Sequence, residues 1–204
     1  PPSVVSDRTQ ITANNFDKIS SLYIPELKKI IVAGKNENSG DDLEMIVGEV
    51  DDTGSFTWGS VTQIETDRLA GDPGLVYDPS TQRLVVLYYC DGMSNPEYSI
   101  FSRVLTLSGN TISNIGSRTT LRNQDGGSFW GTELVYDPDN QKIVAVYRRG
   151  GGNNPYSAVG TVTGGSTNTV SWGTPVQITS ENTGMLDATY DPDTNRVLMV
   201  TRGP

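Results

Sequence analysis

Short apolar runs rich in Val, Ile, Tyr and Thr alternate with clusters of Gly, Pro, Asn and Asp along the whole chain. No window shows the 3.6-residue period of an amphipathic helix. The stretch between residues 132 and 178 shows the pattern most clearly, with strand-length segments at Thr132–Tyr136, Lys142–Tyr147, Tyr156–Val162 and Thr169–Ile178. Segments of this length and composition, bounded by turn residues, predict β-strands. The fold class predicted is therefore all-β.

The strand pattern belongs to an internal repeat. A Tyr-x-Pro marker recurs at Tyr23, Tyr77, Tyr136 and Tyr190, at intervals of 54, 59 and 54 residues. A second marker aligns without gaps at Val5–Ile11, Trp58–Ile64, Ile115–Leu121 and Trp172–Ile178. Two markers that share one period define repeats at about 16–64, 69–121 and 130–178, a partial repeat at 184–204, and a strand within 1–12 from a flanking repeat.

Four short antiparallel strands in a repeat of about 50 residues are typical of a β-propeller blade. The chain is therefore predicted to be a single β-propeller domain or segment, with about three and a half blades. Two arrangements stay open at this point. The ends could meet in an incomplete fourth blade and close a small four-bladed ring, or the blades could belong to a larger ring. Unpaired strand edges at both ends favour the larger ring, because such edges promote aggregation unless they are covered.

Charge and composition exclude several classes of function. The 204 residues carry 15 Lys and Arg against 24 Asp and Glu, a net charge of −9, which disfavours nucleic acid and anionic membranes as partners. No apolar run is long enough for a membrane helix, so no membrane insertion is predicted. The only cysteine, Cys90, ends an apolar run and is predicted to be a buried small residue.

Histidine is absent, which removes the commonest general base and most zinc sites. Carboxylate pairs occur at Asp41/Asp42, Asp51/Asp52 and Asp137/Asp139, but acids in turns usually bond to their own backbone. Calcium in an acidic turn is the alternative, although the EF-hand pattern is missing. The sequence therefore predicts no catalytic residue, no metal and no cofactor.

Candidate ligand contacts come from the polar loops. In a propeller, the loops between second and third strands and the connections between blades emerge on one face, where binding usually resides. Aromatic side chains beside Asn, Asp and Arg suit a sugar. Trp58 and Trp172 occupy equivalent repeat positions and are predicted to pack blades, whereas Trp130 has no equivalent and is the best single candidate for a ligand contact. The predicted ligand-binding residues are Arg122, Asp125, Phe129, Trp130, Arg148, Arg149, Asn153, Asn154 and Tyr156.

The repeat resembles a known type. Val135-Tyr-Asp-Pro-Asp, an apolar strand ending in Tyr-Arg, a Gly/Asn loop, Val-Gly-Thr-Val and Ser-Trp-Gly-Thr-Pro-Val are similar to repeats in virion structural proteins of tailed phages, notably those of marine and cyanobacterial hosts. Weaker copies at Val76–Leu121 and Leu22–Ile64 extend the resemblance over nearly the whole chain. It implies a β-propeller in a tail, fibre, decoration or adhesion role, on a virion or cell surface. It carries over no catalytic residue.

Three hypotheses follow. The first is a non-enzymatic virion or extracellular surface protein that binds a host glycan or receptor, or neighbouring structural subunits, as a homo-oligomer or part of a larger assembly. The second is a purely architectural fibre or decoration module. The third is a carbohydrate-active enzyme of propeller fold, which needs two acids converging near the central channel.

Overall fold

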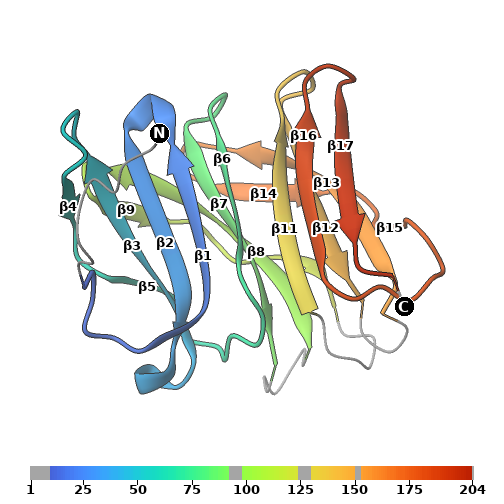
Figure 1. Cartoon of the computed structure of the whole chain (residues 1–204), viewed down its shortest axis with the longest axis horizontal. Helices are drawn as coiled ribbons and strands as arrows, with labels where there is room; N and C mark the ends of the chain where they lie inside the picture. Colours follow the sequence, from blue (N-terminus) through green and yellow to red (C-terminus); the bar gives the residue numbers. More distant parts are fainter. Residues whose placement is uncertain (1–9, 92–97, 124–129, 150–152, 204) are drawn as a thin grey trace, which may run out of the picture.

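The computed structural model describes residues 10–91, 98–123, 130–149 and 153–203, and nearly all of its regular structure is antiparallel β-sheet (Figure 1). The strands form three five-stranded sheets and a hairpin, here named sheets A, B and C and hairpin D. Each sheet contains one sequence repeat. The all-β prediction is confirmed.

The elements follow the chain in order. Sheet A contains β1 (Phe16–Ile24), β2 (Lys29–Asn36), β3 (Asp42–Val50), β4 (Phe56–Trp58) and β5 (Thr62–Glu65), with short 3-10 helices η1 (Pro25–Leu27) and η2 (Glu37–Ser39). Sheet B contains β6 (Gly74–Asp78), β7 (Arg83–Cys90), β8 (Ser99–Ser108), β9 (Thr111–Ile115) and β10 (Thr119–Arg122). Sheet C contains β11 (Trp130–Asp137), β12 (Lys142–Arg148), β13 (Pro155–Thr163), β14 (Thr169–Trp172) and β15 (Val176–Gln177). Hairpin D contains β16 (Leu186–Asp191) and β17 (Arg196–Thr201).

Each sheet has five strands where the sequence predicts four, because the fourth is divided. In sheet C the predicted strand Thr169–Ile178 becomes β14 and β15, and both pair with β13. The division falls at Gly173-Thr174-Pro175, where Pro175 has no backbone N–H to donate. The Gly173 N–H still donates to the Val159 carbonyl (2.8 Å), and Gly59 and Gly116 make the same contact in sheets A and B. The three sheets are therefore built alike.

In the second, third and partial repeats, the first hairpin turns on the aspartate of the Tyr-Asp-Pro marker. The carboxylate of Asp137 accepts from the backbone N–H groups of Asp139 and Asn140, both at 3.1 Å. Asp78 and Asp191 bond to their own turns in the same manner. These carboxylates fix the turn that follows the Tyr-x-Pro marker, as expected for Asp in such loops.

The core lies between neighbouring sheets. One apolar cluster joins sheets A and B, and a second joins sheets B and C. Along β7, Leu84, Val86 and Tyr88 face sheet A, whereas Val85 and Leu87 face sheet C. Because β7 is covered on both faces, its sequence is continuously apolar and does not alternate. Cys90 at its end is buried, as predicted.

Trp58 and Trp172 lie at equivalent positions of their sheets, and Trp172 packs against the core between sheets B and C as predicted. A Cβ atom added to Gly48 would lie 2.6 Å from the Trp58 ring, and one added to Gly160 would lie 2.7 Å from the Trp172 ring. Each indole therefore covers a glycine of the third strand. The Trp172 Nε1–H also donates to Ser102 of sheet B (3.0 Å), which ties the two sheets together.

A buried polar network joins sheets A and B. The carboxylate of Glu65, at the end of β5, accepts from the Tyr88 hydroxyl (2.8 Å) and from Nη2 of Arg103 (2.9 Å). Burial disfavours the charged carboxylate, but the bonds from Tyr88 and Arg103 outweigh it and hold the pKa of Glu65 below its ordinary value. Glu65 is therefore negatively charged, and Arg103 of sheet B compensates its charge.

Hairpin D follows the other sheets in the same order but has two strands. The first strands lie side by side in space in the order β1, β6, β11 and β16 (Figure 1). In the described part of the chain, no strand of hairpin D pairs with sheet A, and closure into a ring is not seen. No helix within these residues has the length and apolar character required to span a membrane.

Candidate functional site

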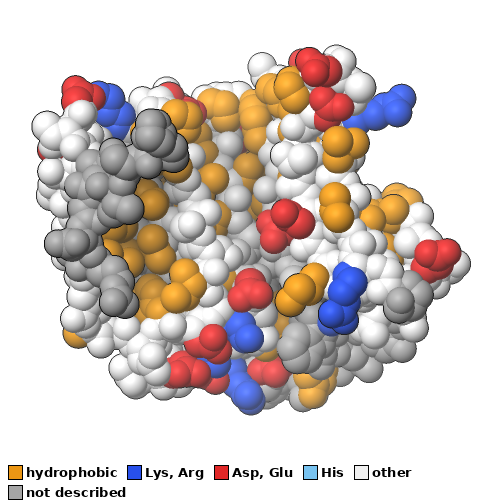
Figure 2. Space-filling view, viewed as in Figure 1, with side chains coloured by type: hydrophobic (Ala, Val, Ile, Leu, Met, Phe, Trp, Pro, Cys, Tyr) orange, Lys and Arg blue, Asp and Glu red, His pale blue; other side chains and the backbone are white. Residues whose placement is uncertain are grey.

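The connections between sheets meet the loops between second and third strands at one end of the molecule. The Leu69 N–H donates to the Asp41 carbonyl (2.8 Å), and the Asp91 N–H donates to Arg68 (3.2 Å). In sheet C the Thr183 N–H donates to Asn153 (3.0 Å). We call this end, formed by residues 37–41, 66–73, 153–154 and 178–185, the loop rim. It is the lower end in Figure 1, and Figure 2 shows acidic and basic side chains gathered along it.

Three of the predicted ligand residues form one cluster beside the loop rim. The guanidinium of Arg122 lies 5.1 Å from the centre of the Tyr156 ring, and that of Arg149 lies 6.0 Å from it. The same ring stacks on Tyr147 at 5.9 Å, and the Tyr156 hydroxyl donates to the side chain of Gln177 (3.0 Å). Because Tyr156 is only 8% exposed, its ring supports the two arginines and has little face to offer a sugar.

Arg148, Asn153 and Asn154 lie in the adjoining part of the rim. Nη1 of Arg148 donates to the carbonyls of Thr183 and Gly184, at 3.2 and 3.3 Å. Asn154 donates to the Ser180 carbonyl (2.8 Å) and so fixes the loop. Asn153 and Arg148 line a depression of about 610 Å³.

The remaining predicted residues cannot be placed as side chains. Asp125 and Phe129 lie outside the described residues. Trp130 begins β11 and pairs with Arg148 of β12, but its side chain also lies outside the described part. The prediction of Trp130 as a ligand contact stays a prediction.

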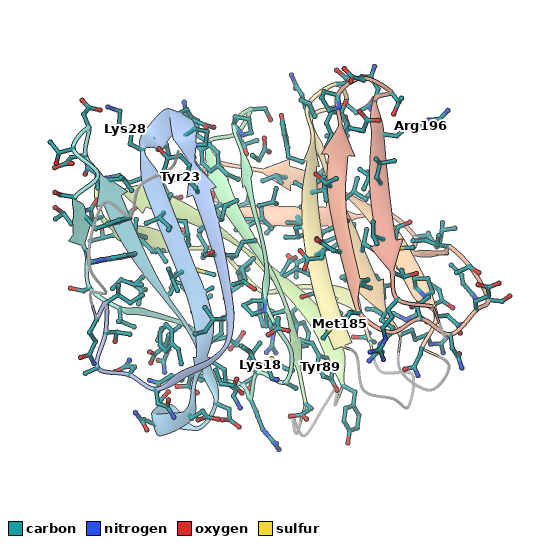
Figure 3. All side chains as sticks on the ribbon, in the orientation of Figure 1. Lys18, Tyr23, Lys28, Tyr89, Met185 and Arg196 are labelled. Carbon is teal, nitrogen blue, oxygen red and sulfur yellow. The ribbon has the colours of Figure 1, made fainter. Side chains whose placement is uncertain are left out.

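A cleft of about 390 Å³ adjoins this depression, between sheet C and hairpin D. It is lined by Asp72, Gly131, Glu133, Arg148, Gly184, Met185, Leu186 and Arg202. Acidic, basic and apolar side chains thus share one recess. Met185, labelled at the lower end of the strands in Figure 3, is 81% exposed.

Glu133 is a carboxyl of this cleft whose pKa is raised. Burial raises its pKa to about 7, and the negative charges of Asp187 on β16 and Asp72 before β6 add to the shift. Asp72 is held near β11 because the Thr132 hydroxyl donates to its backbone carbonyl (2.8 Å). The protonation of Glu133 therefore changes in the neutral pH range.

Two arginines form the basic part of the cleft. Arg148 ends β12, and Arg202 follows β17 at the equivalent position of the partial repeat. Burial, with a smaller contribution from the neighbouring charge of Arg202, lowers the pKa of Arg148 from its ordinary value. Within the described ranges, the guanidinium of Arg202 makes no hydrogen bond or ion pair. The cleft therefore presents a cation available to an anionic ligand.

Glu133→Gln is expected to stabilise the protein at pH 8 and to have little effect at pH 5. A carboxyl whose folded-state pKa is raised favours folding below its unfolded pKa and loses that contribution as the pH rises toward 7. Glutamine removes the buried charge, so the advantage at pH 8 should be about 1–2 kcal/mol for a partly exposed side chain. Urea unfolding at both pH values measures it. An equal effect at pH 5 and pH 8 would contradict the raised pKa.

The carboxylate pairs noted in the sequence have structural partners. Asp51 accepts from the N–H groups of Thr53 and Ser55, at 2.8 and 2.9 Å, within its own turn. Asp41 accepts from Arg68 (3.3 Å), and Asp42 accepts from the Gln63 amide. Among the described residues, no group of three or more His, Cys, Asp or Glu side chains could hold a metal ion.

Sequence reasoning missed Glu133 and Asp187. Each stands three residues before the tyrosine of its repeat, where the earlier repeats have Ser20 and Gly74. Because these positions fall on the adjacent first strands β11 and β16, the two acids come together across a sheet boundary. Comparison of that single repeat position would have indicated the pair.

Fold and site together define the chain as an all-β repeat protein with a charged cleft at its loop rim. No protein-family model and no curated protein sequence matches it.

Proposed function

We propose that the chain is a run of β-propeller blades in a virion or extracellular surface protein, and that it binds an acidic glycan without catalysis. The blade assignment is supported by three equivalent sheets in which each first strand lies beside the next. The surface location is supported by the resemblance of the repeat to those of phage virion proteins. Receptor binding by such a protein would combine several weak contacts, as in other multivalent surfaces.

The observation that carries the ligand class is the composition of the cleft. Arg148 and Arg202 can bind a carboxylate or sulfate with charge-assisted hydrogen bonds. The carboxylates of Asp72 and Glu133 can accept from sugar hydroxyls, and exposed Met185 can cover an apolar ring face. An acidic sugar supplies the anion, the hydroxyls and the ring face together.

Arg202→Ala is expected to weaken glycan binding about tenfold or more, because a hydrogen bond to a charged group contributes about 1.5–3 kcal/mol. Arg196→Ala is the matched control, since Arg196 lies at the opposite end of β17 (Figure 3). Binding of both variants and of the wild type is measured on a glycan array and then by titration with the best acidic oligosaccharide. Absence of binding by the wild type would contradict the proposal and favour a purely architectural module.

A glycoside hydrolase is the second candidate, favoured by Glu133 alone. A carboxyl with a pKa of about 7 near two further carboxylates is suited to act as a general acid. Incubation of the bound oligosaccharide with wild type and Glu133→Gln, followed by mass spectrometry, separates the candidates. Cleavage by the wild type and not by the variant would show that the protein is a glycoside hydrolase and would contradict binding without catalysis.

A further inference from the structure

Neighbouring sheets are joined by the same glycine contact. A Cβ atom added to Gly59 of sheet A would lie 1.7 Å from the carbonyl oxygen of Asn110, in the β8–β9 turn of sheet B. A Cβ added to Gly116 of sheet B would lie 2.0 Å from the carbonyl oxygen of Asn168, in the β13–β14 turn of sheet C. In both cases a turn from the next sheet rests directly on the glycine that follows the first half of the fourth strand.

A cation strengthens each of these contacts. Nζ of Lys29, the first residue of β2, donates to the side-chain oxygen of Asn110 (2.5 Å). Nε of Arg83, the first residue of β7, donates to the side-chain oxygen of Asn168 (3.0 Å). Each asparagine is therefore held by a glycine and a cation of the preceding sheet, and each is followed by a threonine that begins the fourth strand.

Sheet C has the same pair of a cation and a glycine, here called the receptor. In the described structure no turn from another sheet rests on it. Lys142 is the first residue of β12, and Gly173 follows β14. In the described part of the chain, a Cβ on Gly173 would meet only the Val159 carbonyl of its own sheet, at 3.4 Å. Within the described ranges the Lys142 ammonium makes no hydrogen bond or ion pair. The third copy therefore has its glycine and its cation but, in the described ranges, no asparagine turn bound to them.

The edge of β17 beside this receptor is also unpaired. Among the described residues, strands β2, β7 and β12 pair on both sides, whereas β17 pairs only with β16. Val146 of β12 is 1% exposed, but Val200, its counterpart on β17, is 71% exposed. In Figure 2 the surface steps back beside this hairpin. By analogy with sheets A, B and C, the neighbour that fits the edge of β17 is a third strand, and the group that fits Lys142 and Gly173 is the turn after that strand.

We propose that β17, Lys142 and Gly173 together bind one β-hairpin. Its first strand pairs antiparallel with β17, as β13 pairs with β12, and its turn places an Asn-Thr pair on Gly173 with the Asn side chain accepting from Lys142. A second copy of the chain does not supply this hairpin, because β3, β8 and β13 already pair on both sides. The occupant is therefore a hairpin with the sequence features of this repeat. The proposal is independent of glycan binding.

A peptide of residues 153–178, which contains β13, the Asn168 turn and β14, is the probe. Fluorescence anisotropy of the labelled peptide with the whole chain should give saturable binding, weakened about tenfold or more by Gly173→Ala in the protein or Asn168→Ala in the peptide. Gly203→Ala is the control, because a Cβ there has no neighbour within 4 Å among the described residues. Hydrogen exchange should show slower exchange of the β17 amides when the peptide is bound.

The isolated peptide can bind too weakly to be detected, since a hairpin alone is marginally stable. A second experiment therefore links the peptide covalently to the chain. The same segment is appended to the C-terminus through a flexible Gly/Ser linker, which gives an effective concentration in the millimolar range. The fusion should melt at a higher temperature than the fusion with Asn168→Ala. Equal melting of the two fusions, or peptide binding unaffected by Gly173→Ala, would overturn the proposal. Self-association of the chain that Gly173→Ala abolishes would overturn it in favour of a second copy.

Discussion

Arg103→Met is expected to lower the free energy of unfolding by about 3–5 kcal/mol, because it leaves the charge of Glu65 buried with one of its main partners removed. Glu65 is 6% exposed, and Arg103 contacts it through Nη2 at 2.9 Å from the neighbouring sheet. The loss therefore falls on the junction between sheets A and B. Equilibrium urea unfolding at pH 7 measures the change.

The matched control is Lys28→Met, which breaks the exposed ion pair between Lys28 and Asp52 and should have little measurable effect. Adding Glu65→Gln to Arg103→Met should recover much of the stability, because the buried charge is then gone. Since the pKa of Glu65 is lowered in the folded protein, its contribution is present above the ordinary glutamate range and is lost as the pH falls through the lowered value. A loss from Arg103→Met that is as large in strong acid as at pH 7 would contradict this account.

Gly116→Ala should destabilise the protein by about 1–3 kcal/mol, the usual range for overpacking of a closed contact. The added Cβ would lie 2.0 Å from the Asn168 carbonyl oxygen, so sheets B and C must move apart to admit it. Gly173→Ala is the same substitution at the equivalent position of sheet C, where its nearest neighbour lies at 3.4 Å. Its effect should be close to zero.

Thermal unfolding of the two variants beside the wild type tests the pair directly. The two variants have the same substitution at the same position of the repeat, and they differ in whether a turn of the next sheet lies on the glycine. Equal melting temperatures for Gly116→Ala and Gly173→Ala would show that the turn of the next sheet does not rest on the glycine.

The sequence predicts much of the fold because its markers act locally. The Asp of each Tyr-Asp-Pro bonds within its own turn, and the Trp of the second marker covers a glycine on the adjacent strand. The division of the fourth strand was not predicted, since its Val, Thr and Ile content hides the break at Gly173–Pro175. Closure of a ring depends on contacts between distant sheets, which a repeat period does not specify.

The candidate site was predicted in part. Arg122, Arg149 and Tyr156 do lie together, but stacking on Tyr147 and cover by the two arginines bury the tyrosine, which no local pattern reveals. Glu133 and Arg202 were missed because each becomes notable only through a neighbour from another repeat, Asp187 in one case and Arg148 in the other. The charge of the cleft therefore depends on which repeats lie next to each other in the fold.

The most direct test of the proposed function is the mapping of backbone amide shifts by NMR during titration with the acidic oligosaccharide that binds best. The account predicts that shifts concentrate at residues 72, 131–133, 148, 183–186 and 202. It also predicts that they need about tenfold more ligand or more to saturate in Arg202→Ala, but are unchanged in Arg196→Ala. Saturable shifts confined to other parts of the chain, with this set unchanged, would contradict binding at the cleft.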